Sequence, residues 1–197
     1  MNKTNKSVNI ALFASGSGSN VENIHNYFHE NSSVNISCVL CNNPKAYVLE
    51  RVKRLSLDFL LFNREEFNNP DIILTYLSSK NVDLIVLAGF LWLIPSYLID
   101  KYPGKVINIH PALLPKYGGK GMFGSHVHKV VFENKEATTG ITIHYVNNKY
   151  DEGEIIFQKS IAITNTDNPE TIANKVHELE YKYYPHIIEK IALHLLR

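Results

Sequence analysis

The chain has 197 residues, of which 45% are hydrophobic, and its 20 basic and 19 acidic residues leave a formal net charge of +1. This length fits one domain, and the near-neutral charge argues against a nucleic-acid partner held by bulk electrostatics. Residues 1–7 are polar and the apolar run after them is too short for a signal peptide or a membrane span, so we expect a cytoplasmic protein with one domain over residues 1–197 and no membrane partner.

The first half of the chain alternates short apolar runs with segments of helical periodicity. Near-continuous apolar strands that alternate with helices are typical of a parallel sheet covered on both faces. The predicted strands are residues 8–14, 34–40, 59–62, 83–89 and 106–110, and the predicted helices are residues 21–29, 47–55, 72–79 and 95–101.

The second half follows a different pattern. Residues 125–133 have helical spacing, whereas residues 139–146 and 154–163 alternate polar and apolar side chains as antiparallel strands do. A long helix is predicted over residues 169–196, with Pro185 expected to kink it. The fold class is therefore α/β: a Rossmann-type, mostly parallel sheet with helices on both faces and antiparallel later strands.

The predicted strand 106–110 ends in a polar pair, Asn108 and His110, before Pro111. Residues two apart on a strand share a face, so both side chains project together at the carboxyl end of a buried strand. Ligands of open α/β sheets bind at that edge. An amide donor beside an imidazole suits acyl transfer, because one group stabilises an oxyanion and the other moves a proton. The alternative is an ordinary hydrogen-bonded strand end.

A Gly/Ser turn, residues 15–20, joins the first strand to the first helix. Backbone N–H groups at such a helix N-terminus bind phosphate. A dinucleotide fingerprint would need a third glycine where Val21 stands and an acidic residue near Asn42, and a Walker loop would need Gly-Lys-Ser/Thr. The turn is therefore either a monophosphate site or a plain strand–helix turn.

Three further groups have both structural and functional interpretations. Asp151, in the polar loop 147–153, either pairs with an imidazole and raises its pKa or sits in a solvated hairpin. We expect no metal at His126 and His128, which have no third ligand, and we expect His144 to be a buried, hydrogen-bonded histidine. Cys38 and Cys41 belong to a strand-like run, in which residues three apart face opposite ways, so they are not placed to bind one metal ion together. Both should be buried, reduced thiols.

These motifs, in this order, resemble the folate-dependent formyltransferase family over residues 10 to about 186. The most specific match is Asn108-Ile-His110-Pro111-Ala-Leu-Leu-Pro115 followed by Asp151-Glu-Gly153. The turn 15–20, the run Leu87-Ala-Gly-Phe90 and Glu180 before Tyr184-Pro185 also fit the family.

The resemblance implies transfer of a formyl group from the co-substrate 10-formyltetrahydrofolate to the amine of glycinamide ribonucleotide, in de novo purine biosynthesis. The transfer would be direct, through a tetrahedral intermediate and without a metal. The implied catalytic residues are Asn108, His110 and Asp151. Asn108, and His110 when protonated, would stabilise the oxyanion. His110 would assist proton transfer to the folate nitrogen, and Asp151 would hold His110 and keep it protonated enough to act.

The resemblance also implies two binding regions. The phosphate and sugar of the ribonucleotide would contact Gly18, Ser19, Asn20, His177 and Glu180. The folate would contact Arg64, Leu91, Trp92, Leu93, Ile94, Asn108, Asn147, Asn148, Lys149 and Tyr150. The chain also departs from the family pattern. Trp92 stands where the family often has Arg. The Gly-rich loop 118–124 is longer than in many members, and this loop, with Lys120, either closes over the phosphate or is a tolerated insertion.

Other functions compete with this one. Formyltransferases that act on methionyl-tRNA or sugar nucleotides, the formyltetrahydrofolate hydrolase, and a non-catalytic nucleotide- or folate-binding protein are the alternatives. The tRNA enzyme would need an added basic nucleic-acid domain, and the hydrolase usually carries an extra N-terminal domain. We therefore expect small-molecule partners only, and a monomer or homodimer.

Overall fold

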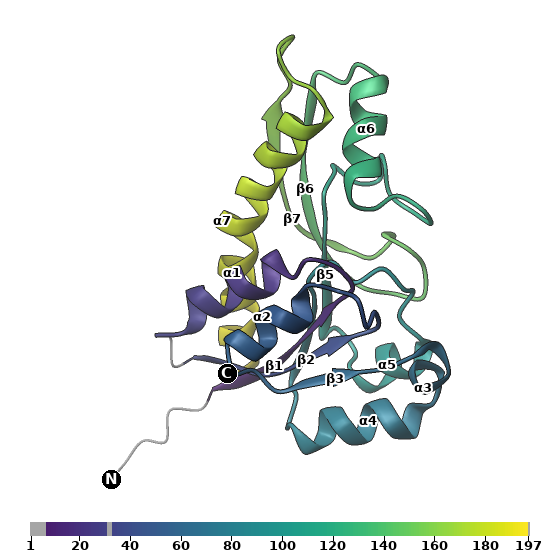
Figure 1. Ribbon diagram of the computed structural model, residues 1–197, viewed down its shortest axis with the longest axis vertical. Helices are drawn as coiled ribbons and strands as arrows, with labels where there is room; N and C mark the ends of the chain where they lie inside the picture. Colours follow the sequence, from purple (N-terminus) through teal and green to yellow (C-terminus); the bar gives the residue numbers. More distant parts are fainter. Residues whose placement is uncertain (1–6, 31–32, 197) are drawn as a thin grey trace.

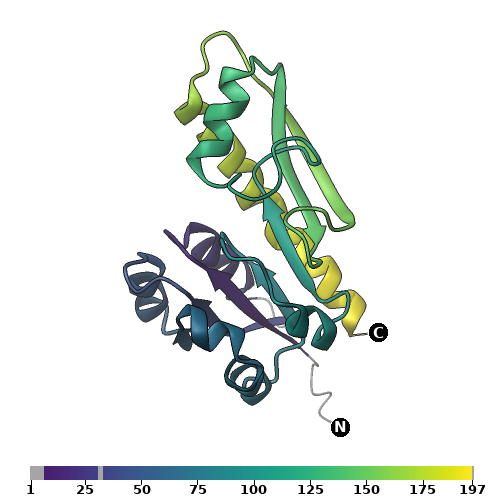
Figure 2. The ribbon, with the colours of Figure 1, turned by 90° about the vertical axis from the view of Figure 1, so that its right-hand side faces the viewer.

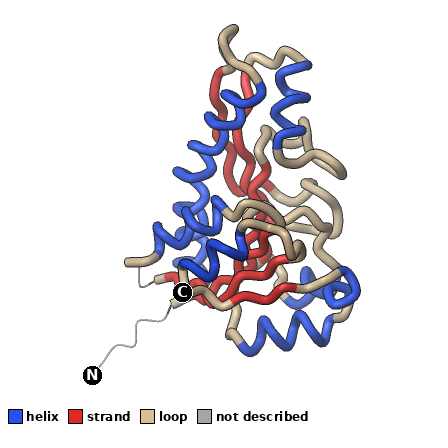
Figure 3. Tube along the Cα trace, in the orientation of Figure 1, coloured by secondary structure: helices blue, strands red, loops and turns tan. Residues whose placement is uncertain are grey.

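The computed structural model describes residues 7–30 and 33–196 and contains one seven-stranded sheet in the order β3-β2-β1-β4-β5-β6-β7. The sheet runs through the middle of the molecule with the helices around it (Figure 3). Strands β1 to β5 pair in parallel, whereas β6 and β7 are antiparallel additions, which confirms the predicted fold class. The strands are β1 (Val8–Ala14), β2 (Val34–Cys41), β3 (Phe59–Leu61), β4 (Leu84–Leu87), β5 (Val106–His110), β6 (Thr138–Tyr145) and β7 (Ile155–Ala162).

Helices cover both faces of the sheet (Figure 1). Helices α1, α2 and α7 bury their apolar side chains against one face, and α3, α4 and α5 against the other. Strands β6 and β7 extend with α6 beyond the parallel strands (Figure 2). The helices are α1 (Ser19–Phe28), α2 (Val48–Arg54), α3 (Arg64–Asn68), α4 (Pro70–Ser79), α5 (Ser96–Lys101), α6 (Ser125–Glu133) and α7 (Pro169–Leu195).

Helix α3 was not predicted from the sequence. It has five residues, too few to show a helical period. Its start is nevertheless encoded: the Asn63 side chain accepts the N–H groups of Glu65 and Glu66, and the Glu66 carboxylate accepts the N–H of Asn63. This reciprocal capping box is a recognisable sequence signal.

The two cysteines lie on opposite faces of β2, as predicted. Cys38 is buried with α4 and α5, and Cys41 with α1 and α2; both are free thiols. Burial raises the pKa of Cys38 to about 12. Because the thiolate is the reactive form, these thiols are inert core side chains.

Helix α7 continues through Pro185, which has no N–H to donate to the carbonyl of Tyr181. The side chain of Asn23 in α1 donates to that carbonyl instead, at 3.0 Å. One residue before the proline, the hydroxyl of the fully buried Tyr184 donates to the carbonyl of Leu87 at the end of β4. Helix α7 is therefore attached by hydrogen bonds to both α1 and the sheet.

Across residues 7–30 and 33–196, no helix combines the length and apolar character needed to cross a membrane. The prediction that no signal peptide is present rests partly on residues 1–6, which lie outside the described residues.

Candidate active site

A cleft of about 550 Å³ opens at the carboxyl ends of β1, β4 and β5, the edge where open α/β sheets bind ligands. Its lining combines apolar side chains that follow β4 with polar groups from the ends of β1 and β5 and from α7. The segments that line it include 16–20, 87–94, 108–111, 119–124 and 149–151, with His128, His144, Val146, His177 and Glu180.

Strand β5 presents Asn108 and His110 to this cleft, as their spacing predicts. The antiparallel neighbour β6 sets His144 opposite Asn108 and Thr142 opposite His110. The Asn108 amide donates from Nδ2 to Nε2 of His144 at 3.2 Å. Pairing of β5 with β6 thus adds a second imidazole to the predicted pair.

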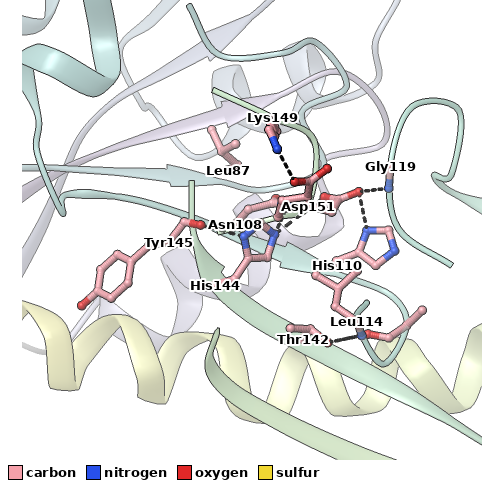
Figure 4. A network of polar contacts seen from close by, with 12 residues as sticks. Leu87, Asn108, His110, Leu114, Gly119, Thr142, His144, Tyr145, Lys149 and Asp151 are labelled. Atoms are coloured by element: carbon pink, nitrogen blue, oxygen red, sulfur yellow. Dashed lines mark hydrogen bonds and ion pairs between the residues drawn. The ribbon is translucent and has the colours of Figure 1, made fainter. Parts of the chain in front are cut away.

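Asp151 reaches the same place from the loop after β6, and its carboxylate lies between the two imidazoles (Figure 4). Its Oδ2 atom is 3.5 Å from Nδ1 of His110, and its Oδ1 atom is 3.7 Å from Nε2 of His144. Oδ2 also accepts the N–H of Gly119 at 2.9 Å. Asp151 has a left-handed backbone, φ 55°, which Asp tolerates better than most residues.

Hydrogen bonds assign the proton positions on His110. Nε2–H donates to the carbonyl of Tyr117 at 2.7 Å, so the lone pair of the neutral ring is on Nδ1, facing Asp151. Burial lowers the pKa of His110, and nearby His144 lowers it further, which outweighs the rise caused by Asp151 and the Tyr117 hydrogen bond. Asp151 therefore raises the pKa of His110, as expected, but burial of the ring has the larger effect and the net shift favours the neutral imidazole.

Asp151 itself stays ionised. Burial raises its pKa, but the polar contact with His144, the attraction of His110 when that ring is protonated and the N–H of Gly119 together bring the pKa below the usual value. A buried carboxylate beside a neutral imidazole is arranged to stabilise a positive charge that forms on the imidazole later.

His144 was expected to be a buried structural histidine, and it is buried and hydrogen-bonded; its place in the site was missed. Its Nδ1–H donates to the carbonyl of Tyr145 at 2.8 Å, which leaves Nε2 to accept from Asn108. Gly153 makes this arrangement possible, because a Cβ at this position would lie 1.6 Å from the Tyr145 carbonyl oxygen. The signal that would have found His144 is its register opposite Asn108, which no local sequence pattern contains.

The segment after β5 is attached to the antiparallel strands. Thr142 donates its hydroxyl to the carbonyl of Ala112 at 2.7 Å and accepts the N–H of Leu114 at 3.0 Å. Gln158 of β7 donates to the carbonyl of Leu114 at 2.9 Å. These bonds fix the chain immediately after His110.

The cleft is lined in part by the residues predicted to hold the ribonucleotide. Gly18, Ser19 and Asn20 line it at the start of α1, and His177 and Glu180 line it from α7. Asn20 donates from Nδ2 to Oε2 of Glu180 at 3.0 Å. Burial raises the pKa of Glu180 to about 7, although the Asn20 hydrogen bond lowers it.

The lining also contains most of the residues predicted to hold the folate. Leu91, Trp92, Leu93, Ile94, Lys149 and Tyr150 line the cleft, and the N–H of Leu93 donates to the hydroxyl of Tyr150 at 3.2 Å. Arg64 contacts the cleft only through Trp92, whose ring centroid lies 3.9 Å from its guanidinium carbon. Asn147 and Asn148 are outside the lining; Asn147 shapes the loop by accepting the N–H of Lys149.

Metal ligation is not supported at the histidines of α6. His128 is buried in the cleft beside His177, and burial lowers its pKa to about 4, whereas His126 is exposed. Over the described ranges 7–30 and 33–196, no three His, Cys, Asp or Glu side chains form a group that could hold a metal ion.

Comparison with known proteins shows the family. The family model for formyl transferases matches residues 8–188. The chain belongs to the formyl transferase family. A protein of Bacillus subtilis named phosphoribosylglycinamide formyltransferase is 38% identical over 186 residues, which cover 92% of this chain and 93% of the relative. A chloroplastic protein of the same name from Arabidopsis thaliana is 37% identical over 93% of this chain, which spans 65% of that relative's length.

Solved structures agree with this family assignment. The crystal structure of phosphoribosylglycinamide formyltransferase from Anaplasma phagocytophilum superposes with a TM-score of 0.86 at 31% identity, covering 95% of this chain and 88% of that one. The formyl transferase resemblance seen in the motifs is thereby confirmed over nearly the whole chain.

Proposed function

We propose that this formyl transferase moves a formyl group from 10-formyltetrahydrofolate to the amine of glycinamide ribonucleotide, a step of purine biosynthesis. The observation that carries the proposal is the convergence of Asn108, His110 and Asp151 in one cleft, which is also lined by polar groups at the start of α1 and by apolar side chains after β4. The names of the relatives in Bacillus subtilis and Arabidopsis thaliana support this acceptor.

Both substrates fit the character of the cleft. Its volume of about 550 Å³ lies within the range of small-molecule sites. The N–H groups of Gly18 to Asn20 suit the phosphate of the ribonucleotide, and Glu180 suits its sugar hydroxyls. The apolar side chains that follow β4, together with Trp92 and Tyr150, suit the flat ring system of the folate.

Asn108 would stabilise the charge that develops on the formyl oxygen when the amine attacks. One hydrogen of its amide is donated to His144, which fixes the plane of the amide and leaves the other hydrogen for the cleft. A donor that is already oriented loses no energy in reorganisation during the reaction.

His110 would move the proton. The attacking amine must lose a proton and the departing folate nitrogen must gain one. A neutral His110 takes up the first proton at Nδ1, where Asp151 stabilises the imidazolium, and then returns a proton to the leaving nitrogen. In this role His110 acts first as a base and then as an acid, and it begins the cycle neutral.

The test measures release of the folate product spectrophotometrically, with and without glycinamide ribonucleotide. Turnover that requires the ribonucleotide, and that is lost in His110→Ala while folate binding persists, supports the proposal. Turnover without the ribonucleotide would identify a hydrolase. No turnover under either condition, with folate still bound, would identify another acceptor or a binding protein.

A further inference from the structure

Helix α2 holds the Gly/Ser turn that begins α1. The N–H of Val48 donates to the carbonyl of Gly16 at 3.1 Å, and Nε of Arg51 donates to the carbonyl of Ser17 at 2.9 Å. Two successive carbonyls of the turn therefore face α2. A trans peptide directs its N–H away from its carbonyl, so the N–H groups of Ser17 and Gly18 point away from α2. These residues line the cleft on that other side.

Arg51 is itself held in place by contacts on several sides. Its guanidinium forms an ion pair with Glu22 of α1 and lies 5.1 Å from the ring centroid of Tyr47. Its side chain is only 19% exposed. Arg54 pairs with the same carboxylate but is 57% exposed, and it is Arg51, not Arg54, that donates to the turn. Arg51 alone of these two arginines thus joins α2, α1 and the turn.

A second, independent observation concerns Asn20, which lies at the start of α1. Asn20 is 8% exposed and lines the same cleft. Among the described residues, its buried Oδ1 atom has no hydrogen-bond partner, although its Nδ2 donates to Glu180. Leaving a buried polar atom unpaired is unfavourable, so we expect this atom to pair when a substrate with a hydroxyl or amine group binds.

Gly18 shows how closely α2 and the turn fit together. Its φ of 76° lies in the left-handed region, and a Cβ there would lie 2.4 Å from a methyl group of Val48. The turn therefore packs directly on the first turn of α2, and its peptide planes depend on where α2 stands. Successive N–H groups aimed at one place form an anion-binding concavity.

We propose that Arg51 is a positioning residue for the phosphate of the acceptor substrate. It holds the Ser17–Gly18 peptide so that the Gly18 N–H faces the phosphate, and it touches no reacting atom itself. The inference rests on the proposed function, since it assigns the phosphate-binding turn a support outside the cleft.

The test compares Arg51→Met with Arg54→Met, which removes the other partner of Glu22 and leaves the turn untouched. Binding of ribose 5-phosphate, followed by phosphorus NMR, reports on the phosphate site without any turnover. We expect Arg51→Met to weaken this binding about tenfold, equivalent to about 1.4 kcal/mol, and Arg54→Met to change it less than about twofold. The KM for glycinamide ribonucleotide should rise in parallel, while kcat and the KM for the folate stay near the wild-type values.

A double variant separates orientation from charge. Arg51→Met also leaves Glu22 less neutralised, and that carboxylate would repel a phosphate. If orientation matters, Glu22→Gln combined with Arg51→Met stays as weak as Arg51→Met alone. Recovery of binding in the double variant would overturn the proposal, as would equal losses in Arg51→Met and Arg54→Met or an equal rise in the KM for folate. Ribose 5-phosphate binding without formyl transfer would instead refute the proposed function and leave the Arg51 comparison valid.

Discussion

Oδ2 of Asp151 lies 3.5 Å from Nδ1 of His110, the ring nitrogen that carries no proton in the neutral form. The pair forms an ion pair only after His110 has taken up a proton. In the proposed mechanism, the carboxylate would therefore stabilise a charge that forms during the reaction rather than before it.

Asp151→Asn should lower kcat about 100-fold or more, the usual scale for losing general acid–base assistance, because an amide cannot stabilise the imidazolium as a carboxylate does. The variant is isosteric, so folding should be preserved. Steady-state kinetics checks this, with Glu152→Gln as the control: Glu152 is the exposed neighbour that pairs with Lys149. Equal activity of Asp151→Asn and wild type would exclude the role given to Asp151.

The pH dependence should show one limb on the acid side. Burial lowers the pKa of His110 from 6.5, and the neutral ring is the form that accepts a proton. The value of kcat/KM should therefore be level at neutral pH and fall as the pH drops through the lowered pKa. In Asp151→Asn the limb should move to still lower pH, because the carboxylate raises the pKa of His110. A rate that falls with rising pH across about pH 6–7, the ordinary range of histidine, would show that the imidazolium is the active form.

His144→Gln should lower kcat about 10-fold to 100-fold, because the Asn108 amide loses the partner that orients it. His144 also lowers the pKa of His110, so the acid limb should move to higher pH in this variant. That movement distinguishes an electrostatic and orienting role from mere loss of packing. His126→Gln, on an exposed histidine outside the cleft, is the control and should leave the profile unchanged.

The free energy of unfolding should fall in mild acid because His128 is buried in its neutral form. Its pKa is about 4 in the folded protein against 6.5 for an ordinary histidine, so the unfolded chain binds its proton first. The contribution is complete above pH 6.5 and is lost as the pH falls toward 4, by about 3 kcal/mol. Denaturant titrations at about pH 7 and about pH 4 should show a smaller difference for His128→Leu than for wild type or His126→Leu. The same pH sensitivity in all three proteins would contradict the assignment.

Gly153→Ala should destabilise the fold by about 2 kcal/mol or more, because the new Cβ would overlap the carbonyl oxygen of Tyr145 and must displace it. Activity should fall as well, since that carbonyl fixes the His144 ring. Thermal melting measures the effect, and Gly16→Ala, which meets no atom within 4 Å, provides the matched control for stability.

Local sequence patterns predicted the parallel half of the sheet, its helices, and the placement of Asn108 and His110, because burial period and strand alternation are properties of short segments. The reach of Asp151 and Glu180 to the same cleft came from the family resemblance. Contacts between strands that are distant in the sequence could not be predicted from local patterns. One example is the register of β5 and β6, which sets His144 opposite Asn108. The net shift in the pKa of His110 could not be predicted either, because a sequence shows its charged neighbour but not the depth of its burial.

The residues predicted to contact the folate show the same limit. Arg64 is the first residue of α3, directly after its N-cap Asn63. Its guanidinium stacks on Trp92, and the position of that ring depends on its contacts with Phe62, Phe67 and Phe90. Sequence spacing gave no way to see that this cation reaches the cleft through a ring rather than directly.

Because Asn23 donates a hydrogen bond to the Tyr181 carbonyl, the amino acid that is tolerated at position 23 depends on the amino acid at position 185. With proline at position 185, the Tyr181 carbonyl needs an outside donor, and Asn23 supplies it. In a Pro185→Ala background, the helix would satisfy that carbonyl itself and position 23 would be released from its constraint. Loss of the amide at position 23 should therefore be harmful beside Pro185 and nearly neutral once Pro185→Ala is present, so evolutionary drift at either site is limited by the residue at the other.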